Sequence, residues 1–163
     1  MKRALLVFVT LVLLWTITGL INQSLAGLHL HVFLGGLYIT YAAVALDPLP
    51  GLIAVLLGGA VCDAHSPTAF GTQMLWFAAA HAFLRQLRDR IPHEETVGRV
   101  AIALICNLGL YLVMSFGWVA EAGNPSAYWT RAFCDLIVSQ VGLVLIAPWF
   151  FALQERTAAY ASD

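Results

Sequence analysis

The sequence predicts an all-α integral membrane protein of about six transmembrane helices, forming one domain over residues 1–163. Hydrophobic residues make up 61% of the chain and charged residues only 10%, whereas a soluble domain is typically about 45–50% apolar and about 25% charged. Apolar runs close to the roughly 20 residues needed to cross a bilayer recur along the chain. Because the breaks between these runs are short, no room remains for a separate soluble domain.

The apolar runs set the expected helices. The first run follows Lys2 and Arg3 and is 18 residues long, longer than the roughly 7–15 residues of a secretory-signal core. We therefore expect an uncleaved first helix. The helices are predicted at about residues 4–22, 28–46, 51–63, 69–88, 97–120 and 127–153.

Prolines and polar turns mark the expected helix ends. Two prolines in the segment 47–50 break the second run, because proline cannot continue a helix. The third run is short, so it forms either a short tilted helix or a broken one. Ser126 is a suitable N-cap for the last helix, and Pro148 predicts a kink or an early end there. The tail 154–163 is expected to fray.

The basic residues are distributed unevenly along this pattern. With six crossings, the two termini and the loops 47–50 and 85–96 share one side of the membrane. That side holds Lys2, Arg3, Arg85, Arg88, Arg90, Arg99 and Arg156, and the other holds only Arg131. Cytoplasmic loops carry the excess of lysine and arginine, so both termini are expected in the cytoplasm of a multi-pass inner (plasma) membrane protein. The net charge of −1 does not indicate a nucleic-acid partner.

Three ionisable residues lie in or at the edge of apolar runs, where they cost free energy and therefore have a packing or functional role. Arg131 and Asp135 are four residues apart on one helix, so they can neutralise each other. Asp63 could join them if the third and sixth helices touch. These residues form either a structural ion pair or a ligand or partner site.

Other polar residues predict neither a metal site nor an enzyme. The spacing of the residues expected near the outer face matches no known ligand motif, so no metal or cofactor is predicted: His29, His31, Cys62, Asp63 and His65. No nucleophile motif of the GxSxG type occurs, and residues 93–95 do not begin an HExxH motif.

Deeper polar and small residues predict helix packing. His81, Asn107 and Gln140 lie within apolar runs, where such groups often hydrogen-bond across helices. The glycine pairs 35–36 and 58–59 and the alanines around residues 78–82 allow helix backbones to approach closely, either within the chain or with a partner helix.

The third run carries a pattern seen in a known family. Gly59 and Asp63 have the spacing G-x-x-x-D at the end of a helix, and Gly71 follows after a short turn and before another helix that ends in arginines. This pattern resembles the central signature of the MreD family of rod-shape-determining membrane proteins. Chain length, helix number and cytoplasmic termini are also similar to that family.

The resemblance implies a non-catalytic scaffold subunit of the bacterial cell-wall elongation complex, which takes part in regulating cell shape. The implied partners are an MreC-like bitopic protein and, through it, the RodA glycosyltransferase, a penicillin-binding transpeptidase and MreB filaments, all at the lipid bilayer. It also implies a fold similar to the substrate-binding subunits of energy-coupling-factor transporters. The alternative is therefore a subunit that binds a small, vitamin-type molecule in an outward-facing pocket involving Asp63, Arg131 and Asp135.

Overall fold

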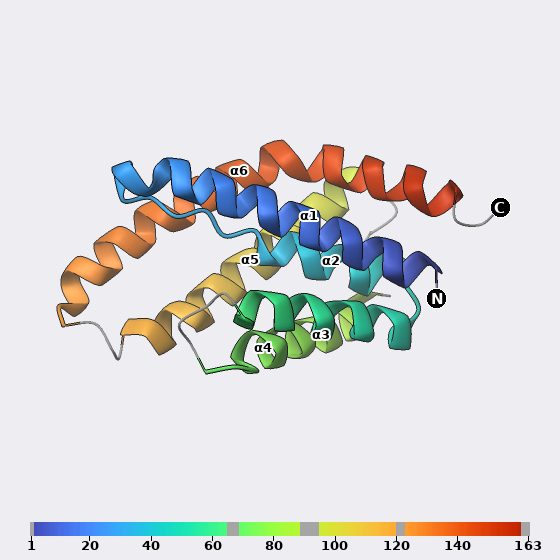
Figure 1. The fold of residues 1–163 in the computed structure, drawn as a ribbon, viewed down its shortest axis with the longest axis horizontal. Helices are drawn as coiled ribbons and strands as arrows, with labels where there is room; N and C mark the ends of the chain where they lie inside the picture. Colours follow the sequence, from blue (N-terminus) through green and yellow to red (C-terminus); the bar gives the residue numbers. More distant parts are fainter. Residues whose placement is uncertain (1, 65–68, 89–94, 120–122, 161–163) are drawn as a thin grey trace.

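The computed structural model describes residues 2–64, 69–88, 95–119 and 123–160, and within these ranges the chain forms helices and no strand. The prediction of an all-α protein is confirmed. The helices within these ranges pack into one bundle (Figure 1): α1 Lys2–Leu25, η1 Ala26–Leu28, α2 Gly35–Ala45, α3 Pro48–Ala64, α4 Thr72–Leu87, α5 Thr96–Val119 and α6 Pro125–Tyr160.

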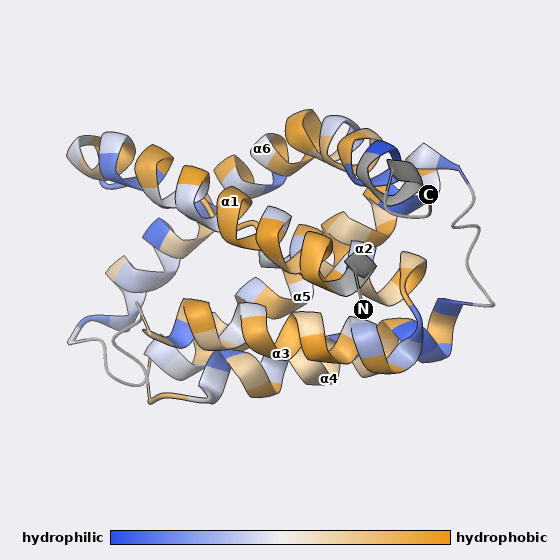
Figure 2. Cartoon of the chain, turned by 45° about the vertical axis from the view of Figure 1, so that its right-hand side comes forward, coloured by the Kyte–Doolittle hydropathy of each residue, from blue (hydrophilic) through white to orange (hydrophobic). Residues whose placement is uncertain are grey.

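Three helical stretches are long and apolar enough to cross a membrane: Leu5–Leu28, Thr96–Val119 and Pro125–Arg156. Large apolar side chains on these helices are exposed, among them Leu13 and Trp149. Hydrophobic residues follow the middle of the helices, and hydrophilic residues gather at their two ends (Figure 2). An apolar belt of this kind suits the lipid interior, so the chain is a membrane protein.

Contacts between side chains bring the first part of α1, the start of α5 and the last part of α6 together at one end of the bundle (Figure 1). Arg99 of α5 forms an ion pair with Glu155 of α6 and lies 5.7 Å from the ring centre of Phe151. Gln154 of α6 donates a hydrogen bond to Thr10 of α1. These contacts place the start of α1 and the end of α6 at the same end of the molecule.

The shortest α-helix, α2, lies at the centre of the bundle. Its residues from Gly35 to Val44 are all buried, and Leu37, Ile39 and Ala42 are 0% exposed. It packs against α3, α4 and α5. Arg85 of α4 holds its end, donating a hydrogen bond from Nη1 to the carbonyl oxygen of Leu46 at 2.7 Å. A helix that is apolar on all sides suits a position away from water, and here α2 is enclosed by the other helices.

The prediction of one continuous helix over residues 28–46 was wrong in its first half. Residues 26–28 form a 3₁₀ turn, His29 adopts a left-handed backbone with φ of 55°, and α2 begins only at Gly35. An 11-residue helix reaches only about 16 Å. The six residues before it add up to about 20 Å when extended, so helix and extended segment together can match the roughly 30 Å of a bilayer core.

The third helix is longer than predicted and unbroken. It covers Pro48–Ala64, which is 17 residues rather than 51–63. Pro48 and Pro50 lie in its first turn, where the backbone N–H groups have no partner within the helix. The two prolines therefore belong to the first turn of α3, together with the residues around them.

The last helix also differs from its prediction at both ends. Asn124 and not Ser126 is the cap, since its Oδ1 accepts a hydrogen bond from the N–H of Ala127 at 3.2 Å. Pro125 takes the first helical position, which proline favours. The helix continues through Pro148 to Tyr160, so the expected early end was wrong. In an apolar environment neighbouring groups compensate the single backbone bond that proline removes.

Candidate functional site

The carboxylate of Asp63 caps the N-terminus of α4. Its Oδ1 accepts a hydrogen bond from the N–H of Gln73 at 2.9 Å, and its Oδ2 accepts from Gly71 at 3.0 Å and from Met74 at 3.1 Å. The first N–H groups of a helix lack partners within it and carry partial positive charge. Asp63 is only 3% exposed, so these three donors compensate the burial of its charge.

Gly59 and Gly71 make this cap possible. Gly71 has a φ of +98°, which is unfavourable for a residue with a side chain. Gly59 lies one turn before Asp63, and a Cβ there would come within 2.7 Å of Cα of Met74. The backbones of α3 and α4 therefore touch at Gly59. We call Gly59, Asp63 and Gly71 the capping unit, because all three act on the same turn at the start of α4.

Substitutions of the adjacent Gly58 and Gly59 test the close approach of α3 and α4. We expect Gly59→Ala to destabilise the protein by about 1–3 kcal/mol, the usual cost of overpacking, because its Cβ meets backbone atoms of α4. Gly58→Ala places a Cβ 3.5 Å from Cδ1 of Leu11, an ordinary contact, and we expect no loss of stability. The melting temperatures of both variants in mild detergent measure this, and equal shifts would contradict the close contact between α3 and α4.

A second polar group holds the extended segment that precedes α2. Two side chains of α6 accept hydrogen bonds from its backbone. Oδ1 of Asp135 accepts from the N–H of His31 at 2.8 Å, and Oγ of Ser139 accepts from the N–H of Phe33 at 2.9 Å. The hydroxyl of Ser139 in turn donates to the carbonyl of Asp135 at 2.6 Å. The start of α6 is thereby tied to residues 31–33.

Two asparagines complete this clasp. Asn22 of α1 accepts from the N–H of Val32 at 2.7 Å and donates to its carbonyl at 2.9 Å. Asn107 of α5 is fully buried, donates to the carbonyl of Phe33 at 3.0 Å and accepts from the N–H of Gly36 at 3.0 Å. Backbone groups outside a helix need such partners at membrane depth. We call Asn22, Asn107, Asp135 and Ser139 the backbone clasp.

Two of the three polar residues expected to hydrogen-bond across helices do so. Asn107 does hydrogen-bond across helices, and Gln140 of α6 donates to the carbonyl of Leu104 of α5 at 3.1 Å, so both expectations are confirmed. His81 is buried on α4 beside Gly51 of α3. No role was assigned to Asn22 or Ser139 from the sequence. The sequence feature that could have indicated these partners is the apolar run around residue 35. It has no helix-start signal, so the backbone groups before α2 need hydrogen-bond partners from other helices.

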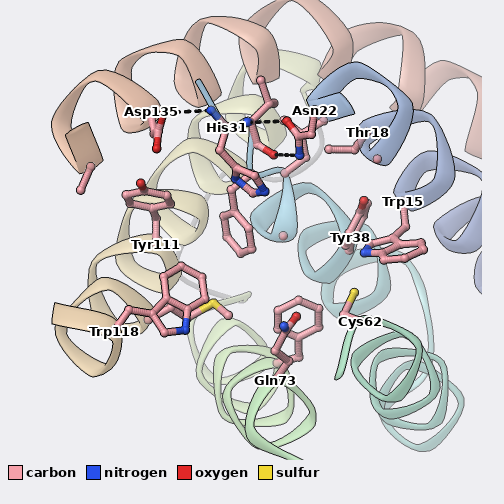
Figure 3. A pocket seen from close by; sticks show the side chains of 18 of the residues that line it. Trp15, Thr18, Asn22, His31, Tyr38, Cys62, Gln73, Tyr111, Trp118 and Asp135 are labelled. Atoms are coloured by element: carbon pink, nitrogen blue, oxygen red, sulfur yellow. Dashed lines mark hydrogen bonds between the residues drawn. The ribbon is translucent and has the colours of Figure 1, made fainter. Parts of the chain in front are cut away.

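A cavity of about 650 Å³ lies next to the clasp and is lined by residues of all six α-helices and of the extended segment. Its lining comes from the last part of α1, α3 and α5 and the first part of α4 and α6, at the opposite end from Arg99 and Glu155. Aromatic side chains form much of its wall. Figure 3 shows Trp15, Tyr38, Tyr111 and Trp118, and the lining also includes Phe77 and Tyr128.

Arg131 and Asp135 line this cavity as an ion pair. Nε of Arg131 lies 3.9 Å from Oδ2 of Asp135, so the predicted pairing of these two residues is confirmed. The side chain of Arg131 is 59% exposed, whereas that of Asp135 is 8% exposed. The expectation that Asp63 joins them was wrong. Its carboxylate is bound to the start of α4 and is not part of the cavity lining, although the adjacent Cys62 is.

The candidate metal ligands do not gather. Within the described ranges no three or more His, Cys, Asp or Glu side chains come together in a way that could hold a metal ion. His65 lies outside the described residues, as do residues 89–94 of the basic loop and residues 161–163 of the tail. Cys62, Cys106 and Cys134 are free thiols.

The chain was compared with protein-family models, with curated proteins and with solved structures, and none of the three comparisons found a match.

Proposed function

We propose that this chain is a non-catalytic membrane subunit of the bacterial cell-wall elongation complex, of the MreD type, with a role in cell shape. The observation that carries the proposal is the capping unit. The three residues on which the resemblance rests, Gly59, Asp63 and Gly71, contact one and the same helix turn. The pattern on which the resemblance rests therefore has a defined structural role in this chain.

The proposed orientation follows the charges. The end of the bundle with Arg85, Arg99 and Arg156 is placed in the cytoplasm, following the preference of basic residues for that side. The cavity, with Arg131, is then on the outer side. In this arrangement the chain is a multi-pass protein of the inner membrane. An MreC-like bitopic protein contacts it within that membrane and connects it to RodA and a transpeptidase.

The use of the buried polar groups supports a non-catalytic role. Asp63 holds three backbone N–H groups, and Asp135 holds another and faces Arg131. A general base needs a lone pair that is free to reach a substrate. The carboxylate of Asp63 is buried and bound to the start of α4, and that of Asp135 is only 8% exposed and binds the backbone of His31.

Affinity purification of the tagged chain from mildly solubilised native membranes, followed by mass spectrometry, tests the proposal. An unrelated multi-pass protein with the same tag serves as the control bait. We expect MreC, RodA or the penicillin-binding transpeptidase to be enriched over this control, and we expect rod-shaped cells to become rounder when the chain is depleted. Absence of all three partners together with unchanged cell shape would contradict the scaffold role.

The cavity favours a second candidate, a subunit that binds a small molecule for uptake. Its volume of about 650 Å³ lies within the range of ligand pockets, about 300–1,000 Å³. In the same purification, enrichment of a paired ATPase with a coupling membrane subunit would favour this candidate over the scaffold.

A further inference from the structure

We propose that the cavity binds an amphipathic molecule whose anionic group, a carboxylate or a phosphate, is held by Arg131 and whose apolar body lies against the aromatic wall. This site does not depend on the proposed function, because its evidence comes only from the cavity and is independent of any partner. Either a scaffold or a transport subunit could use it.

The wall of the cavity suits an apolar body. Side chains of Trp15, Tyr38 and Trp118 line the space from three different helices (Figure 3), and Phe77 of α4 also belongs to the lining. Aromatic rings bury large areas and also offer flat faces for stacking. Ligand pockets are commonly built in this way, with a mainly apolar lining and a few polar groups that fix the ligand's orientation.

Arg131 supplies the polar anchor. A guanidinium group has five N–H donors in a planar fork, which matches the oxygens of carboxylates and phosphates. Within the described part of the chain, the only polar contact of the Arg131 side chain is the ion pair with Asp135 at 3.9 Å, which is too long for a hydrogen bond. The side chain of Arg131 is also 59% exposed, so a ligand can reach its donors.

Asp135 is a poorer anchor than Arg131, which favours an anionic over a cationic ligand. One oxygen of Asp135 accepts the N–H of His31 at 2.8 Å, and the other faces Arg131. Its side chain is only 8% exposed, compared with 59% for Arg131. The more exposed and less engaged of the two charges is the positive one.

Gly19 of α1 provides a way to block the cavity without disturbing the helices. It lines the cavity, and a Cβ built there meets nothing within 4 Å. We therefore expect Gly19→Phe to be tolerated by the helices and to fill part of the cavity with its ring. The matched control is Gly109→Phe on α5. Gly109 is exposed, its Cβ also meets nothing within 4 Å, and it is not part of the lining.

The test uses two fluorescent probes that differ in charge, pyrenebutyrate and the neutral pyrenebutanol. Binding to the purified full chain in neutral detergent is followed by energy transfer from tryptophan to pyrene, since Trp15 and Trp118 line the cavity. We expect the wild-type chain to bind the anionic probe about tenfold more tightly, because hydrogen bonds to charged groups are among the stronger ones. Arg131→Gln should remove this preference.

The two glycine variants locate the site. Gly19→Phe should lose binding of both probes, and Gly109→Phe should bind both as the wild-type chain does. Equal affinity of the wild-type chain for the two probes would overturn the anion site, as would a preference that persists in Arg131→Gln. Equal binding by Gly19→Phe and Gly109→Phe would show that the probes bind elsewhere, which would also overturn the proposal.

A second arm separates the two sources of such an anion, a bilayer lipid and a water-soluble molecule. Native mass spectrometry compares retention of dioleoyl phosphatidate with retention of dioleoylglycerol on the wild-type chain and on Arg131→Gln. Phosphatidate retained in an Arg131-dependent manner would identify a lipid phosphate as the ligand. Arg131-dependent binding of pyrenebutyrate alone would identify a soluble carboxylate. Failure of both anions to bind would overturn the proposal.

Discussion

Replacing Asp63 with alanine is expected to cause the largest loss of stability of any single change in the polar residues of this protein. The substitution leaves the N–H groups of Gly71, Gln73 and Met74 without their shared acceptor. A buried donor without a partner costs about 1–3 kcal/mol. Even if water partly solvates the opened turn, we expect a total loss of about 3–5 kcal/mol, similar to that on breaking a buried ion pair.

The melting temperature in mild detergent and the yield of monodisperse protein measure this loss. Asp63→Asn keeps one acceptor oxygen but not the charge, so it should fall between alanine and the wild-type residue. Asp47, an exposed aspartate before α3, is the control, and Asp47→Ala should cost about 1 kcal/mol or less. A loss in Asp63→Ala no larger than that in Asp47→Ala would show that Asp63 does not hold the start of α4.

The second large effect is expected for Gly36→Ala at the centre of the bundle. A Cβ at Gly36 would lie 2.3 Å from the backbone nitrogen of Asn107 and 2.6 Å from the carbonyl oxygen of Ala103. Both are backbone atoms of α5, so no side chain can turn away to make room. The two helices would have to separate, which would also break the hydrogen bonds of Asn107 to residues 33 and 36. We expect a loss of at least about 3 kcal/mol, at or above the upper range for overpacked cores.

Gly109→Ala on α5 is the matched control for this change. Its Cβ meets nothing within 4 Å, and alanine is about 1 kcal/mol more favourable than glycine within a helix. We therefore expect Gly109→Ala to melt at or above the wild-type temperature and Gly36→Ala to melt well below it or to aggregate. Similar melting temperatures for the two variants would contradict the backbone contact between α2 and α5.

The helical fold was predictable because hydropathy is a local property of the chain. Long apolar runs separated by short polar breaks predict membrane helices without any knowledge of the fold, since a bilayer requires a fixed length and internally bonded backbone. This held for the three long helices α1, α5 and α6, whose predicted ranges, 4–22, 97–120 and 127–153, largely overlap Lys2–Leu25, Thr96–Val119 and Pro125–Tyr160. The i,i+4 pair of Arg131 and Asp135 was predictable for the same reason, because both lie on one helix.

The segment 28–46 shows where local reasoning fails. Its apolar composition suits a helix and an extended strand equally, and the difference depends on partners far along the chain. Asn107 and Asp135 lie more than 70 and 100 residues away from the backbone groups that they hold. Only after the helices pack do these side chains replace the hydrogen bonds that a helix would have supplied within the segment.

For the candidate site, too, the sequence predicted one part and the tertiary structure decided the other. The residue pattern identified Asp63, Arg131 and Asp135, because charged groups are costly in apolar runs, and the resemblance to a family signature added Gly59 and Gly71. It could not assign their partners. The tertiary structure decided that Asp63 binds the start of α4 and that Arg131 and Asp135 line the cavity, because the partner of a buried charge depends on which helix ends lie beside it.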